Sequence, residues 1–124
     1  MDTLDELRQL PLFSWLTWEG ITTMASCFDL RTEHLNAGSV CPTGEQVGCL
    51  LRGSAVFESG GTFQTLKPGD LIALGPQRQA LTGTLTAGED CAAVWFHRDL
   101  VRHVCYGACW FHARLIREID RALQ

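Results

Sequence analysis

The fold is decided by residues 50–72, which read LLRGSAVFESGGTFQTLKPGDLI. A Gly-Gly pair at 60–61 separates two short apolar segments and is typical of a two-residue hairpin turn, because both glycines adopt positive φ without steric cost. The Lys-Pro-Gly-Asp segment at 67–70 predicts a second turn, since proline presets φ and glycine supplies the unusual backbone conformation. The stretch therefore predicts consecutive antiparallel strands.

Glycines separate short apolar segments throughout residues 28–98. Around Phe28, Leu30 and Thr32, apolar and polar residues alternate, which predicts a half-buried first strand. Closely spaced apolar segments between glycines indicate an antiparallel roll or barrel. These segments are residues 49–51, 55–57, 63–66, 71–74, 81–85 and 91–96.

Helical periodicity frames this β region on both sides. Leucines at 4, 7 and 10 predict a first short helix that ends at Pro11. Thr17 is a candidate N-cap for a second helix from about Trp18 to Cys27. Residues 99–124 follow a helical period to the end of the sequence.

The final predicted helix carries two adjacent apolar stripes, more than one packing surface needs. One stripe is expected to pack on the roll, and the other to meet a second copy of the helix in a homodimer. A single wide face directed at the core is the alternative. The predicted dimer contacts are Val104, Ala108, Phe111, Leu115 and Ile119.

We therefore predict one domain over residues 1–124. It is mainly β, a jelly-roll-like antiparallel roll at 28–98, with short helices at 1–27 and a long C-terminal dimerisation helix at 99–124. With 46% hydrophobic residues, the 124-residue chain is too apolar for disorder. Its net charge of −4 and single lysine argue against autonomous nucleic-acid binding. We expect a cytoplasmic protein, because neither a signal peptide nor a run near the ~20 apolar residues of a membrane span is present.

The sequence predicts neither an enzyme nor a cofactor site. It has no nucleophile, metal-protease or phosphate-loop motif and no C-x-x-C pair among its six cysteines. Cys105, Cys109 and His112 would share one helix face, so a metal or redox role is the alternative to buried thiols that act as small hydrophobes. Haem ligation is a second alternative, with His34, His97, His103 and His112 as candidate ligands.

The element order and three segments carry a family resemblance. Residues 10–13 (LPLF), the apolar-x-Gly-x-Val pattern within 50–56 and the Gly-Asp turn within 66–72 occur at consistent spacing. Together they resemble the cyclic-nucleotide-binding domain, in particular the effector domain of the Crp/Fnr family of bacterial transcription regulators. The resemblance implies a homodimeric sensor domain with an unidentified small-molecule effector, and DNA binding only through a domain absent from this chain.

The chain departs from that family at the phosphate-binding cassette. Family members that bind cyclic nucleotides use a Gly-Glu pair for the ribose hydroxyl and a later arginine for the phosphate, whereas this chain has Ala73-Leu74 and Leu81 there. Burying a phosphate without a countercharge costs several kcal/mol, so we expect no binding of cAMP in the usual way.

A shift in register would place Arg78 where the family has its phosphate-binding arginine. The alternative is that Arg78 is a solvated loop arginine. The predicted, degenerate ligand site is Leu71, Ala73, Leu74, Arg78 and Leu81. These residues fit either an apolar effector or a filled core. The alternative function is a stand-alone oligomerisation or protein-interaction module that binds no small ligand.

Overall fold

The computed structural model describes residues 3–27, 29–44, 46–97 and 110–123. Within these residues, eight strands form two four-stranded antiparallel sheets, ordered β1-β8-β3-β6 and β2-β7-β4-β5. The elements are α1 (Thr3–Arg8), α2 (Trp18–Cys27), β1 (Arg31–Leu35), β2 (Val40–Pro42), β3 (Val47–Arg52), β4 (Ala55–Ser59), β5 (Thr62–Leu66), β6 (Leu71–Ile72), the 3₁₀ turn η1 (Pro76–Arg78), β7 (Thr84–Ala87), β8 (Cys91–Phe96) and α4 (Trp110–Ala122).

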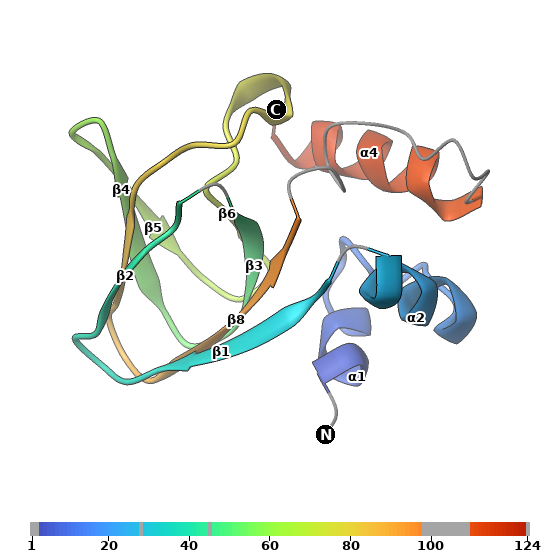
Figure 1. Ribbon diagram of the computed structural model, residues 1–124, viewed down its shortest axis with the longest axis horizontal. Coiled ribbons are helices and arrows are strands. Elements are labelled where there is room, and N and C mark those ends of the chain that lie inside the picture. Colours follow the sequence, from blue (N-terminus) through green and yellow to red (C-terminus); the bar gives the residue numbers. More distant parts are fainter. Residues whose placement is uncertain (1–2, 28, 45, 98–109, 124) are drawn as a thin grey trace.

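The two sheets form a roll, and the helices gather on one side of it (Figure 1). Strand β8 is buried along its whole length because it has a core on each face. Val94 and Phe96 pack with α1, α2 and α4, while Ala93 and Trp95 pack inside the roll. The continuous apolar run at 91–96 follows from this position between two cores.

The turns form as their residue types predict. Gly60 and Gly61 adopt φ of +57° and +83° between β4 and β5. In the next turn the Asp70 amide donates to the Lys67 carbonyl at 3.0 Å, and the Asp70 carboxylate accepts from the Lys67 amide at 2.9 Å. At the start of α2 the Thr17 hydroxyl oxygen accepts a hydrogen bond from the Gly20 amide at 3.0 Å, as an N-cap does.

The predicted long C-terminal helix is not supported. The described helix, α4, has 13 residues from Trp110 to Ala122, and residues 98–109 lie outside the described part of the chain. Leu115 from one predicted stripe and Ile116 and Ile119 from the other are all buried within the same chain. Arg114 adds a cation–π contact, 4.5 Å from the centre of the Trp15 ring. In its described part, the helix therefore buries residues of both stripes against its own domain.

The alternation predicted for the first strand does not hold. Strand β1 begins at Arg31, and Phe28 is outside the described residues. β1 is the edge strand of its sheet, so its side chains are only partly covered. Glu33, assigned by the pattern to the polar face, instead contacts the buried Trp95. No helix in the described ranges is long and apolar enough to cross a membrane.

Candidate functional site

The cassette loop, residues 73–81, forms most of the connection between β6 and β7. Its ends are tied by a hydrogen bond of 2.7 Å from the Leu81 amide to the Ala73 carbonyl. A second bond of 2.7 Å runs from the Gly75 amide to the Gln79 carbonyl, and η1 forms the tip. The loop is therefore a closed hairpin.

Two non-glycine residues of the cassette loop have left-handed backbones. Ala73 has φ +64° and Arg78 has φ +59°. Each such residue costs about 1 kcal/mol relative to an ordinary conformation, and strain of this kind persists only where the surrounding contacts hold it. Packing on both sides of the loop supplies those contacts.

The structure divides the predicted site residues between two faces. Ala73 and Leu81 pack into the roll interior, in an apolar cluster that includes Phe57. A methyl group at Gly75 would come within 3.0 Å of Leu81 Cδ2, so Leu81 lies directly against the loop backbone. Leu71 and Leu74 instead belong to the cluster shared with the helices. The predicted residues therefore do not line one common pocket.

Arg78 is the only ionisable residue of the cassette loop, and it is directed at α4. Its Nη1 lies 2.6 Å from both carboxylate oxygens of Asp120. Its side chain is 25% exposed, and its Nε is buried without a hydrogen-bond partner. The reading of Arg78 as a solvated loop arginine is therefore wrong.

A groove of about 450 Å³ runs between the cassette loop, the Lys67–Asp70 turn and the second half of α4. It contains Leu71 and Leu74 from the predicted site, with charges of both signs around them. Its other lining residues are Pro11, Leu12, Gln64, Lys67, Pro68, Gly69, Asp70, Glu118, Arg121, Ala122 and Leu123. This groove lies on the helix side of the roll.

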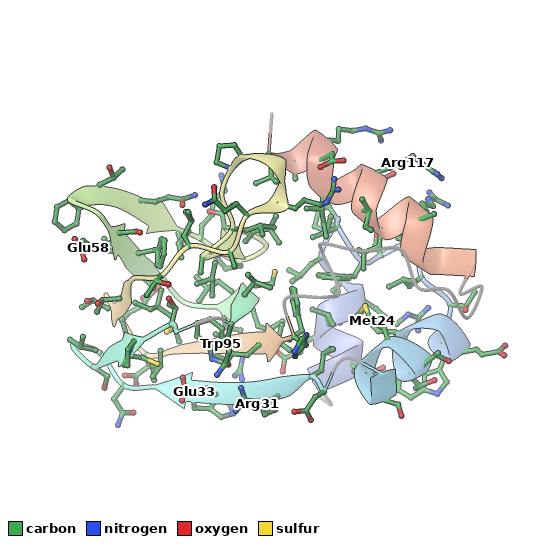
Figure 2. All side chains as sticks on the ribbon, turned by 45° about the horizontal axis from the view of Figure 1, so that its top comes forward. Met24, Arg31, Glu33, Glu58, Trp95 and Arg117 are labelled. Atoms are coloured by element: carbon green, nitrogen blue, oxygen red, sulfur yellow. The ribbon has the colours of Figure 1, made fainter. Side chains whose placement is uncertain are left out.

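Sequence reasoning missed a polar hollow of about 520 Å³ at the other edge of the roll. Oε1 of Glu33 accepts a hydrogen bond from Trp95 Nε1 at 3.2 Å and lies 3.3 Å from Cys41 Sγ. Figure 2 shows Arg31, Glu33 and Trp95 together on β1 and β8. The other residues that line the polar hollow are Thr32, Pro42, Thr43 and Gln46. The signal was a carboxylate diagonal to a tryptophan across a strand pair, because Trp95 pairs with Arg31, two residues before Glu33. This relation is visible only once the strand order and register are known.

The thiols described by the structure are held in their neutral form. Burial and the neighbouring Glu33 raise the pKa of Cys41 to about 11, and burial raises the pKa of Cys49 to about 12. Among the described residues, no group of three or more His, Cys, Asp or Glu side chains could hold a metal ion. Cys105, Cys109 and His103 lie outside that part of the chain, and the side chain of His112 is not described.

Of the five predicted dimer contacts, the structure describes the side chains of two. Leu115 and Ile119 are fully buried in the core of their own chain. Val104 and Ala108 lie outside the described residues, and nothing is described of the Phe111 side chain. Dimerisation itself stays a prediction.

No protein-family model and no curated protein sequence matches the chain. Similar solved structures share its fold at low sequence identity. A putative cyclic nucleotide-binding protein from Geobacter metallireducens is similar over 99% of this chain and 96% of its own, with a TM-score of 0.72 and 17% identity. The catabolite activator protein of Thermus thermophilus is similar over 91% of this chain and 56% of its own, with a TM-score of 0.57 and 21% identity.

A third similar structure is the regulatory subunit of a cAMP-independent protein kinase A from Trypanosoma brucei. It is matched over 96% of this chain and 45% of its own, with a TM-score of 0.63 and 18% identity. This chain thus has the β-roll fold of cyclic-nucleotide-binding domains.

Proposed function

We propose that this chain is a regulatory sensor domain that does not bind cAMP through the usual phosphate clamp. The observation that carries the proposal is the state of the cassette loop. Its one arginine is paired with Asp120 on α4, while Ala73 and Leu81 face the roll interior with apolar neighbours. A cyclic phosphate inside the roll would find no countercharge on this loop, and an uncompensated buried charge is strongly unfavourable.

The similar structures support a sensing role that does not depend on cAMP. The fold includes a catabolite activator protein and a protein kinase A regulatory subunit described as cAMP-independent. The roll is therefore compatible with regulation with or without this ligand.

A ligand titration tests the proposal. We expect cAMP and cGMP to leave the thermal midpoint unchanged, because a ligand at 100 times its dissociation constant would stabilise the fold by about 2.7 kcal/mol. Calorimetry on the same protein checks the result. Micromolar binding of either nucleotide would overturn the proposal, and its loss in Arg78→Gln would then assign the phosphate to Arg78.

We further propose that the domain is the effector half of a Crp/Fnr-type transcription regulator and works as a homodimer. The order of the segments at 10–13, 50–56 and 66–72 supports this assignment. Such a regulator reaches DNA through a separate helix-turn-helix domain. The coding sequence downstream of residue 124 tests this, since an open reading frame without such a domain contradicts it.

A second candidate function is an interaction module with no small ligand. The observation that favours it is the apolar packing at the cassette loop, where Leu81 and Phe57 belong to one cluster. A ligand screen that includes haem and apolar compounds separates the two, because the module predicts no stabilisation by any of them.

A further inference from the structure

The contact between the cassette loop and α4 has an apolar part and an ionic part. Leu74 and Ala80 of the loop belong to the same cluster as Leu115 and Ile119 of the helix. Beside this cluster, Arg78 Nη1 meets both carboxylate oxygens of Asp120 at 2.6 Å. Apolar packing and charge therefore act on the same loop and the same end of the helix.

The ionic part differs from the other described ion pairs of α4. Arg114 and Arg121 pair with Glu118 inside the helix, at 4.0 and 3.3 Å. The Arg78–Asp120 pair instead connects residues 42 apart in the sequence and in different elements. Breaking it changes the docking of α4 on the loop, whereas breaking the Glu118 pairs changes only contacts along the helix surface.

Arg78 is held in a costly state. Its backbone has φ +59°, and its Nε is buried with no hydrogen-bond partner. An arginine presents its N–H groups in a planar fork that matches an oxyanion with two acceptors. Asp120 engages only Nη1 in this arrangement, so the carboxylate occupies one nitrogen of the fork and leaves the buried Nε unpaired.

From these contacts we propose that Asp120 is an intramolecular counter-anion, an autoinhibitory contact that masks Arg78 and clamps α4 onto the cassette loop. An oxyanion that binds Arg78 competes with Asp120 and releases the end of α4. This inference rests on the proposed sensor function and adds a means by which an event at the loop reaches the helix.

Hydrogen–deuterium exchange on the full chain tests the clamp, with Asp120→Asn and Arg78→Gln as variants and no nucleotide present. We expect each variant to raise exchange in peptides from α4 and from residues 73–81 by about three- to tenfold, the range for a charge-assisted bond that is partly exposed. Arg121→Gln is the matched control, because it removes an exposed ion pair from the same helix, and exchange should stay at the wild-type level. Asp120→Glu should restore protection.

Inorganic phosphate is the probe for the masked cation. Phosphate should slow exchange of residues 73–81 in Asp120→Asn and have no effect in Arg78→Gln. Wild-type exchange in Asp120→Asn overturns the clamp, and a phosphate effect that survives Arg78→Gln, or is absent from Asp120→Asn, overturns the role of Asp120 as a counter-anion. Circular dichroism confirms that each variant is folded. Nucleotide binding by the wild-type protein would overturn the sensor proposal without altering these exchange results, so the two failures are distinguishable.

Discussion

Burial and the nearby Glu33 carboxylate together keep the Cys41 thiol protonated. Burial and this carboxylate raise the pKa of Cys41 from 9.0 to about 11. A thiol pKa that is higher in the folded state than in the unfolded chain stabilises the fold below about pH 9. That contribution is lost as the pH rises through 11, because the unfolded thiol ionises first. The same effect keeps Cys41 poorly nucleophilic at neutral pH.

Removing the charge should therefore activate the thiol. We expect Glu33→Gln to increase alkylation of Cys41 by iodoacetamide at pH 8 several-fold, since a larger share of the thiol is then ionised. Mass spectrometry of the peptide that contains Cys41 measures the rate. Glu19→Gln, an exposed change on α2, should leave the rate unaltered. Equal rates in wild type and Glu33→Gln would show that burial alone protects the thiol.

Arg78 pairs with a residue that is distant in the sequence. Read along the chain, it is an isolated cation in a loop, and its partner Asp120 lies 42 residues later. No local pattern joins these two positions. A charged residue in a candidate ligand loop is therefore best judged after its intramolecular partners are known.

Helix α4 has its apolar side within the domain. Leu115 and Ile119 share a cluster with Leu7 of α1 and Met24 of α2, and Arg114 stacks on Trp15. Figure 2 shows Arg117 on the outer side of the helix. The helix is thus an integral part of the fold in the described residues.

Truncation of the buried side should lower stability. We expect Leu115→Ala to reduce the free energy of unfolding by about 2–5 kcal/mol, because a fully buried leucine leaves a cavity. Arg117→Ala, on the exposed side, should change it by less than about 0.5 kcal/mol. Chemical denaturation monitored by tryptophan fluorescence measures both. A Leu115→Ala protein of wild-type stability would contradict the docking of α4 on its own domain.

The domain is built around two hydrophobic cores. One lies inside the roll, and the other lies between the β1-β8-β3-β6 sheet and the helices. Strands β3 and β8 contribute to both cores. The cassette loop and α4 meet at the second core (Figure 1), so the contact between them lies outside the roll interior.

The proposed homodimer can be tested on the intact chain. We expect sedimentation velocity to give twice the 13.7 kDa mass of the chain. Since Leu115 and Ile119 are covered within the chain, the predicted contacts that remain are Val104, Ala108 and Phe111. Phe111→Glu should shift the species to monomer, while Arg117→Ala should not. A monomeric wild type refutes the dimer, and a dimeric Phe111→Glu refutes this placement.

Local chemistry made much of the fold predictable. Glycines at 60–61 form a hairpin turn, Thr17 caps α2, and the apolar run at 91–96 becomes strand β8. Each of these outcomes depends on the residue itself and on neighbours a few positions away, so sequence patterns are sufficient to identify them. The bounds of α2 and β8 follow for the same reason.

Other outcomes were decided only by tertiary packing. Two leucines of the cassette loop pack into different cores. Leu74 lies in the core shared with the helices, and Leu81 lies against the core inside the roll. Periodicity identifies an apolar stripe on a helix, but which surface covers that stripe depends on segments far away in the sequence. The pairing of Arg78 with Asp120 has the same origin. Sequence alone determined the hairpin turns, the approximate positions of most strands and the roll, because these depend on short-range geometry. The three-dimensional fold determined which charges meet and which apolar faces are buried, because those contacts join residues that only folding brings together.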